Sequence, residues 1–235
     1  MEGRIEHGFR ARFRALAASS GVVDPAGEAD RLVAGAIAAA KGAGVPPARA
    51  LADAWLRALA RAKELPRPSA PLPWVRFGDE HPPRFLCDPS LAGLARWLRA
   101  AGYEALVVPG VPGHRLPDEA LRCRLVLLTT EAEVLDRRIV ENGSLAVVWL
   151  PSALTMAEQL HLAAVELGLT LREPRCMACG GALVPRPKGD VRPRIPPRTA
   201  LWKDEYFVCA GCDRLFWRGT HWERIERTLR QAVAA

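Results

Sequence analysis

Two cysteine pairs near the end of the chain constrain its fold more than any other feature. Cys176 pairs with Cys179 and Cys209 with Cys212, each across two residues, and 29 residues separate the pairs. A closed zinc site takes four thiolates in a tetrahedron, and two such turns supply them. Two disulfides or four unrelated thiols are the alternatives, but this repeated spacing is uncommon by chance in a chain with six cysteines. The sequence therefore predicts a small zinc ribbon appended to something larger.

Length and composition allow one main domain with smaller pieces attached. The chain has 235 residues, of which 49% are hydrophobic, and this is enough to bury a core. No apolar run approaches the roughly 20 residues of a membrane helix, and the N-terminus lacks the apolar stretch of a signal peptide. Because four thiols are assigned to metal, we expect a reducing cytoplasm. Cys87 and Cys123 are expected to be ordinary buried thiols.

Charge is spread unevenly along the chain. Residues 84–172 carry 9 basic and 10 acidic side chains, whereas residues 173–235 carry 12 and 7, a net charge of +5. A basic tail beside a slightly acidic centre suits a region that binds polyanions next to a carboxylate metal site. It also suits a soluble protein from an arginine-rich proteome, so charge alone does not decide between the two.

The first 64 residues are expected to be helical. Asp24 and Pro25 can begin a helix that the glycines at 42 and 44 would end, and Pro46-Pro47 can begin another. Six prolines follow within residues 64–83, which is the composition of a linker. We therefore predict a helical extension at 1–64, a proline-rich linker at 65–83, an α/β domain at 84–172 and a zinc ribbon with a C-terminal helix at 173–235.

From Arg84 onwards, apolar strands alternate with helical segments. Strands are predicted at residues 85–87, 103–108, 125–129 and 145–150, with a last helix at 153–168 and another running through Val134 and Ile139. Because the strands are apolar almost throughout, they predict a parallel sheet covered by helices on both faces.

Two of these strands end in acidic residues. Asp88 follows the first strand, Glu131 follows the third, and Asp118 with Glu119 opens a short helix between them. If the two strands are neighbours, their carboxylates meet at the edge where parallel sheets bind ligands. Clustered carboxylates favour Mg²⁺ or Mn²⁺, and such a cation can activate water and stabilise a phosphoryl transition state.

The alternative is that these acids serve the helices instead. Acidic residues cap helices and are favoured in the first turn by the helix dipole. For Asp118 and Glu119 a helix-capping role and a metal-binding role are about equally favoured, whereas Glu133 and Asp136 are expected to face solvent. Asp88 is the strongest metal candidate, because Pro89 and Ser90 could start a helix without a charge there.

Three segments carry a resemblance to a known family. Residues 84–103 read RFLCDPSLAGLARWLRAAGY, residues 127–134 read LLTTEAEV, and residues 216–223 read FWRGTHWE. In this order, with the last segment directly after the second cysteine pair, they resemble the Mut-seven C-terminal ribonuclease domain family over roughly residues 84–225. That family combines a PIN-like nuclease fold with a C-terminal zinc ribbon. The resemblance implies a metal-dependent ribonuclease.

The resemblance also implies roles for single residues. Asp88 matches the first metal-binding aspartate of the family, and Asp118 with Glu119 falls where the family has an acidic helix start. Glu131 departs from the pattern, because the family usually has aspartate there and Mg²⁺ is strict about ligand geometry. The N-terminal extension departs as well, since relatives with an extension often carry a ubiquitin-like domain.

The segment between the cysteine pairs predicts contact with RNA. Arg192, Arg194 and Arg198 lie there, interleaved with aromatic residues, and this combination can hold phosphates and stack bases. The alternative is that the arginines are simply solvated while the aromatics fill the small core of the ribbon. We expect Phe207 and Phe216 in that core and RNA at the three arginines.

These observations lead to one main hypothesis and two alternatives. The main hypothesis is a cytoplasmic PIN-like ribonuclease that binds Mg²⁺ or Mn²⁺ at Asp88, Asp118 and Glu131 and structural zinc at the four cysteines. One alternative is an RNA-binding or ribosome-associated module whose catalytic site has decayed, which the departure at Glu131 keeps open. The other is a zinc-scaffolded interaction adaptor with no affinity for RNA. The N-terminal helices could bind a protein partner or a second copy of the chain.

Overall fold

The computed structural model describes residues 2–64 and 82–233. Three helices form the N-terminal extension: α1 (Glu2–Ser19), α2 (Pro25–Ala43) and α3 (Pro47–Glu64). The Asp24 carboxylate accepts a hydrogen bond from the Gly27 amide at 2.9 Å and caps α2, and Gly44 ends that helix in the left-handed conformation. The helical prediction for this region is confirmed. Most of the predicted linker, residues 65–81, lies outside the described residues.

A parallel sheet follows, as the apolar strands predicted. Its strands are β1 (Phe85–Cys87), β2 (Ala105–Val107), β3 (Val126–Thr129) and β4 (Val147–Trp149), and they run in the order β2-β1-β3-β4 with every pairing parallel. The connecting helices are η1 (Pro89–Leu91), α4 (Ala92–Ala100), η2 (Gly113–Arg115), α5 (Leu116–Cys123), η3 (Ala132–Asp136) and α6 (Arg138–Glu141), and α7 (Met156–Leu167) follows β4. The single helix predicted through Val134 and Ile139 was wrong, because Arg137 is extended and separates η3 from α6.

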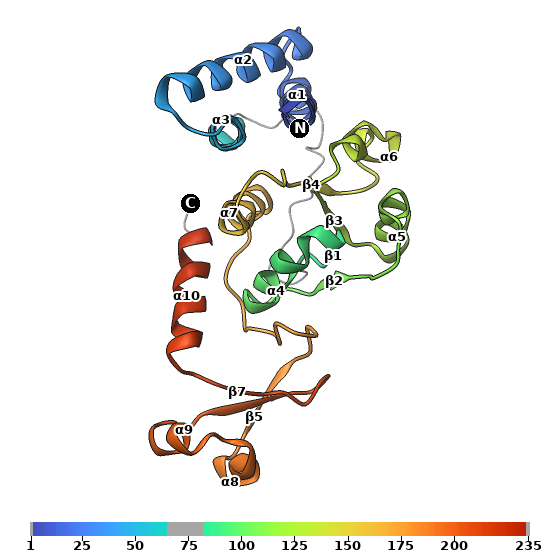
Figure 1. The fold of residues 1–235 in the computed structure, drawn as a ribbon. Helices are drawn as coiled ribbons and strands as arrows, with labels where there is room; N and C mark the ends of the chain where they lie inside the picture. Colours follow the sequence, from blue (N-terminus) through green and yellow to red (C-terminus); the bar gives the residue numbers. More distant parts are fainter. Residues whose placement is uncertain (1, 65–81, 234–235) are drawn as a thin grey trace.

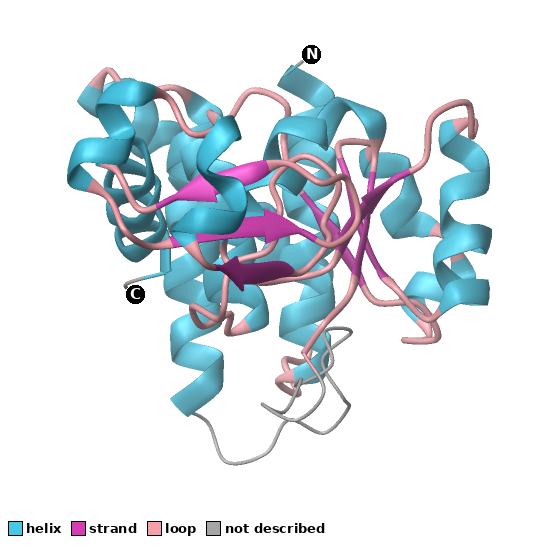
Figure 2. Ribbon diagram, turned by 90° about the horizontal axis from the view of Figure 1, so that it is seen from below, coloured by secondary structure: helices cyan, strands magenta, loops and turns pink. Residues whose placement is uncertain are grey.

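Helices cover both faces of this sheet. Phe85 and Cys87 of β1 join the larger core with α4 and α7, whereas Leu86 between them joins a smaller core with α5 and α6. This alternation follows from the two-residue repeat of a strand. Figure 2, which looks from the side of the C-terminal module, shows the two sheets as separate groups of strands with helices around them.

The N-terminal helices pack against the α/β domain and share its larger core. Phe9 of α1 meets Trp149 of β4 edge-on, with ring centroids 5.2 Å apart, and Phe13 meets Trp55 of α3 in the same way at 5.6 Å. Gly8 allows the close approach, because a Cβ there would lie 2.5 Å from the Trp149 ring. The extension therefore covers β4 and the side of α7 (Figure 1).

A buried ion pair crosses the same contact. The Arg12 guanidinium of α1 pairs with the Glu166 carboxylate of α7, and the two side chains are 4% and 1% exposed. Arg12 also donates to the Trp149 carbonyl at 3.1 Å and lies 4.4 Å from the centre of the Trp55 ring. Burial lowers the pKa of Arg12 to about 9, which leaves the guanidinium charged at neutral pH.

The C-terminal module, residues 173–233, is built on an antiparallel sheet in the order β5-β6-β7. Its elements are β5 (Leu183–Arg186), α8 (Lys188–Val191), η4 (Arg192–Arg194), α9 (Pro197–Trp202), β6 (Tyr206–Cys209), β7 (Leu215–Trp217) and α10 (Thr220–Val233). Helix α10 returns from the module to lie along α7 (Figure 1), where Leu229 and Ala232 enter the larger core. Among the described residues, no helix is long and apolar enough to cross a membrane.

Candidate functional site

Asp88 lies at the carboxyl end of β1 and is 8% exposed. One carboxylate oxygen accepts hydrogen bonds from the amide and the hydroxyl of Ser90, both at 2.9 Å, and the other accepts one from the Thr129 hydroxyl at 3.2 Å. Asp88 therefore caps η1, which is the helix-capping role that was the alternative to metal binding. An ionised carboxylate offers about four acceptor positions, so three donors leave room for one further ligand such as a cation.

Glu131 lies at the end of the neighbouring strand. Strands β1 and β3 pair in register, with Cys87 opposite Leu128, so the two acidic strand ends meet at one edge as predicted. Thr129 links them, because its hydroxyl donates to Asp88 and accepts from the Glu131 amide at 3.1 Å. The Glu131 side chain is exposed and does not cap η3, so its carboxylate can turn toward a bound cation.

Asp118 and Glu119 lie in the first turn of α5, and their surroundings differ. Asp118 is exposed, and its carboxylate lies 4.0 Å from the guanidinium of Arg137. Glu119 is paired with Arg122 one turn later, at 2.5 Å, and this hydrogen bond together with one from Cys123 lowers the pKa of Glu119. The Glu119 carboxylate is thus paired within its own helix, whereas the Asp118 carboxylate remains accessible to a ligand.

The three predicted metal-binding acids do not form a closed cluster. Among residues 2–64 and 82–233, the four cysteines alone form a group of three or more possible ligands whose atoms lie within 4.8 Å of one another. Two of the acids, Asp118 and Glu131, are exposed. Like charges repel, so such side chains close on one another when a cation offsets the repulsion. The donor set is therefore compatible with an open cation site anchored on Asp88.

The four cysteines do form a closed cluster. The sulfurs of Cys176 and Cys212 are 3.7 Å apart, and those of Cys179 and Cys209 are 3.3 Å apart. A tetrahedral site with Zn–S bonds of about 2.3 Å has sulfurs roughly 3.8 Å apart. These cysteines could hold a metal ion, and their geometry is consistent with zinc.

The backbone of the module is shaped around this cluster. The Gly181 amide donates to the Cys179 sulfur at 3.4 Å, and the Gly211 amide donates to the Cys209 sulfur at 3.3 Å. Gly180 has a φ of +80°, and a Cβ on Gly181 would lie 2.8 Å from the Cys209 sulfur. Glycine is needed at both positions because a side chain would be strained at the first and would collide at the second.

A family comparison identifies the chain. The model of the family described as "Mut7-C RNAse domain" matches residues 83–229, which include both acidic strand ends and all four cysteines. The chain belongs to the Mut7-C RNAse domain family. No curated protein and no solved structure matches it.

Within this Mut7-C domain, the C-terminal module docks at the amino end of the parallel sheet. Arg99 of α4 donates to the carbonyl of Ala105, where β2 begins, and to the carbonyls of Met177 and Ala178 in the first cysteine turn. The Arg99 carbonyl accepts from the Arg175 amide at 2.9 Å. The cysteine cluster and the acidic edge therefore lie at opposite ends of the sheet.

The three arginines predicted to bind RNA are all exposed on the module. They flank Val191 and Ile195, which are buried in the small core of the module. The Arg194 guanidinium is already paired with the Asp213 carboxylate at 3.3 Å. Arg192 and Arg198 thus offer their charge to a ligand more readily than Arg194 does.

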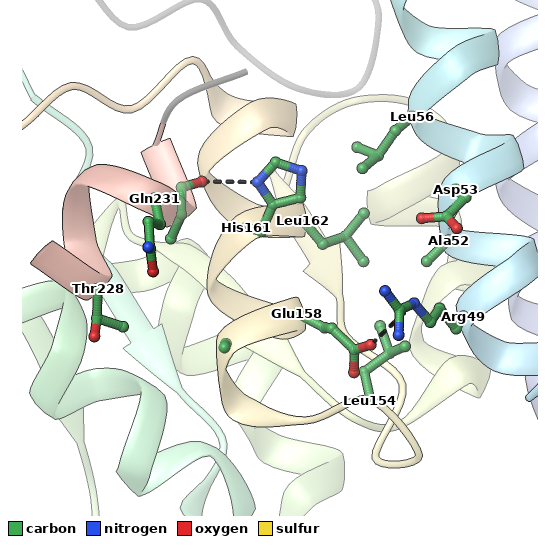
Figure 3. Close-up of a pocket in the computed structure, with 12 residues that line it drawn as sticks. Arg49, Ala52, Asp53, Leu56, Leu154, Glu158, His161, Leu162, Thr228 and Gln231 are labelled. Carbon is green, nitrogen blue, oxygen red and sulfur yellow. Dashed lines mark hydrogen bonds and ion pairs between the residues drawn. The ribbon is translucent and has the colours of Figure 1, made fainter.

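A cavity of about 370 Å³ lies between α3, α7 and α10 of the same chain (Figure 3). Three of its polar side chains are engaged with protein groups: Arg49 pairs with Glu158 at 3.6 Å, and His161 binds the Ala232 carbonyl at 2.8 Å. None of the three predicted metal-binding acids lines it. The cavity is therefore separate from the acidic edge.

Sequence reasoning missed the polar partners of Asp88. Ser90 and Thr129 orient its carboxylate, but Ser90 follows a proline in an ordinary turn and Thr129 ends an apolar strand, so neither stands out in the sequence. Local sequence patterns do not indicate the role of Arg99, because its contacts to the first cysteine turn span 78 residues or more. Of the two remaining thiols, Cys87 is fully buried as expected, and burial raises its pKa to about 12, whereas Cys123 is only half-buried.

Proposed function

We propose that the protein is a metal-dependent ribonuclease with a PIN-like fold that cleaves phosphodiester bonds of RNA at the acidic edge of its parallel sheet. One observation carries the proposal. Asp88 stands at the end of β1, fixed by Ser90 and Thr129 and with one acceptor position left, beside the neighbouring strand end at Glu131. This arrangement occurs within a stretch that matches a ribonuclease domain.

Asp88 would anchor Mg²⁺ or Mn²⁺, and Glu131 and Asp118 would complete the protein's share of the ligands. A cation held there supplies charge stabilisation for the phosphate and acidifies a water. Three hydrogen bonds fix the Asp88 carboxylate, so it meets the cation without reorganisation. Arg137, near Asp118, keeps positive charge at the rim where a phosphate would enter.

We propose zinc as the metal of the four cysteines, in a structural role. Four thiolates leave no open position for catalysis. The exposed Arg192 and Arg198, with Arg194, would attract the RNA backbone, and a reducing cytoplasm would suit a thiolate site.

The test is cleavage of single-stranded and structured RNA by zinc-loaded protein, with Mn²⁺ or Mg²⁺ added and with neither. We expect cleavage that requires the added cation and falls roughly a hundredfold or more in Asp88→Asn. Asparagine still caps η1 through its side-chain oxygen, so the variant removes charge and leaves the fold. Glu133→Gln, an exposed acid two residues beyond Glu131, is the matched control and should cleave normally.

One observation favours a second candidate, the decayed RNA-binding module. Glu131 carries its carboxylate one methylene further than the aspartate usual at this position, and Mg²⁺ tolerates little distortion. If wild-type protein binds RNA in a salt-dependent way but does not cleave it, while Glu131→Asp does cleave, this candidate replaces the first. An interaction adaptor without affinity for RNA would neither bind nor cleave it.

A further inference from the structure

The outer face of the C-terminal module carries an aromatic cavity of about 360 Å³. Its lining includes Leu183 and Pro185 of β5, Phe207 of β6 and Trp222 of α10, with Arg175 and Arg218 beside them. This volume lies within the range of small-ligand sites. The cavity is on the module, so it is distinct from the acidic edge.

The strand repeat explains why this face is open. Tyr206 and Val208 point into the small core of the module, so Phe207 between them points to the opposite face. Pro185 pairs with Phe207 across the sheet, and Leu183 lies two residues before Pro185 on the same face. We expected Phe207 in the core of the ribbon, and that expectation was wrong: it is half-buried and lines the cavity instead.

The segment after the second cysteine pair completes the cavity. Strand β7 ends at Trp217, and α10 begins at Thr220, so the chain turns over Arg218 and Gly219 and brings Trp222 back to β6. The Phe207 and Trp222 rings stack with centroids 6.0 Å apart and planes inclined by 21°. The Arg218 guanidinium lies 5.8 Å and 5.9 Å from the two ring centres, within cation–π range.

The charges at the rim favour an anionic ligand. Arg218 pairs with Glu205 at 3.6 Å, but both side chains are more than half exposed, so this contact is weak and can be exchanged. The Arg175 side chain is held by the first cysteine turn, where it donates to the Gly180 carbonyl at 2.7 Å. The cavity thus places two near-parallel rings and two guanidinium groups together, and of the described residues that line it Glu173 alone is acidic.

We infer that this cavity binds a nucleobase of single-stranded RNA, with Arg218 and Arg175 at the adjoining phosphates. Bases of unpaired RNA stack on aromatic rings and on guanidinium planes. A proline-rich peptide could also use an aromatic groove, but the two arginines and the net charge of +5 on residues 173–235 favour a polyanion. This inference rests on the proposed function, because it names where the substrate is held away from the scissile bond.

The site lies beside the amino end of the parallel sheet, since Arg175 is hydrogen-bonded to the end of α4. A nucleotide in the cavity is therefore not the one cleaved at Asp88. We expect a minimum length of RNA for tight binding, because a very short oligonucleotide reaches only one of the two regions.

The test is binding of a fluorescent single-stranded adenosine decamer to the zinc-loaded full chain in the Asp88→Asn background, followed by anisotropy over a range of salt concentrations. Trp222→Ala should weaken binding about 5- to 150-fold with little change in the salt slope. Arg218→Ala should weaken it and reduce the salt slope by about 1. Leu201→Ala, an exposed apolar residue on α9 outside the cavity, is the control and should bind as the parent does. Zinc content and the thermal midpoint of each variant establish that the module is folded.

Equal affinity in all variants, with normal salt dependence, would overturn the nucleobase site and leave the proposed ribonuclease standing. Absence of RNA binding by the parent, with a proline-rich peptide bound through Trp222, would overturn both. Loss of affinity in Arg218→Ala alone, with Trp222→Ala unaffected, would also overturn the inference, because it would leave a phosphate contact without a stacked base.

Discussion

Removing Arg12 should destabilise the whole protein, because it would leave the Glu166 carboxylate buried without its counter-charge. Glu166 is 1% exposed in its side chain, and it also accepts a hydrogen bond from the Trp55 indole at 3.3 Å. Breaking one side of a buried ion pair costs about 3–5 kcal/mol. We therefore expect Arg12→Met to lower the free energy of unfolding by about 3–5 kcal/mol. Methionine replaces the aliphatic stem of the arginine side chain and so keeps part of the volume beside Trp55 filled.

The assay is urea denaturation of the full zinc-loaded chain, followed by tryptophan fluorescence and circular dichroism. Arg10→Met is the matched control on the same helix: Arg10 pairs with Asp30, both are exposed, and its loss should change stability by less than about 1 kcal/mol. The double variant Arg12→Met with Glu166→Leu should recover most of the loss, since apolar replacement of both partners is close to neutral. Two results would show that the buried ion pair does not stabilise the protein as proposed. One is a loss below about 1 kcal/mol in Arg12→Met, and the other is a double variant with a lower free energy of unfolding than either single variant.

Three further predictions concern the module and α7. Removing the metal with a chelator, or replacing Cys209 with serine, should unfold residues 173–233 and release one zinc per chain, whereas Cys123→Ser should keep the zinc. Metal analysis measures the zinc content, and circular dichroism measures the unfolding. Gly181→Ala should weaken metal binding in a chelator competition, because its Cβ would lie 2.8 Å from the Cys209 sulfur, whereas Gly189→Ala, with nothing within 4 Å, should not. Thr155→Ala should cost about 1 kcal/mol by removing the cap of α7. Hydrogen bonds from the Thr155 amide and from its hydroxyl lower the pKa of Glu158, and alanine removes the hydroxyl bond alone. The part of the difference that depends on ionised Glu158 should therefore be full at neutral pH and be lost as the pH falls through the lowered pKa. Urea unfolding at pH 7 and pH 3 checks the last prediction, and an equal difference at both would contradict it.

The sequence predicted the sheet well because local patterns determine it. Apolar runs bounded by acids, prolines and glycines mark strands β1 and β3 even though each has only three or four residues. The cysteine cluster was equally predictable, since two short turns of fixed spacing carry it. The break between η3 and α6 was not predictable, because residues 131–141 have a helical pattern. The extended backbone of Arg137, whose guanidinium donates to the distant His114 carbonyl, interrupts that pattern.

Contacts between distant segments were beyond local reasoning. The pairing of Arg12 with Glu166 joins residues 154 positions apart, and an arginine on a helix reads as solvated until its partner is known. Phe207 illustrates the same limit, because either face of its strand could have been the buried one. The register with Pro185 and Phe216 and the return of Trp222 decide which face it lines.

We propose above all that Asp88 and Glu131 form one cation site at the carboxyl edge of the sheet. Titration of the zinc-loaded protein with Mn²⁺, followed by electron paramagnetic resonance of the free ion, measures that site directly. We predict saturable Mn²⁺ binding that weakens at least roughly tenfold in Asp88→Asn and less in Glu131→Gln, with Glu133→Gln unchanged. Equal Mn²⁺ binding by the wild type and Asp88→Asn, or none by either, would contradict it.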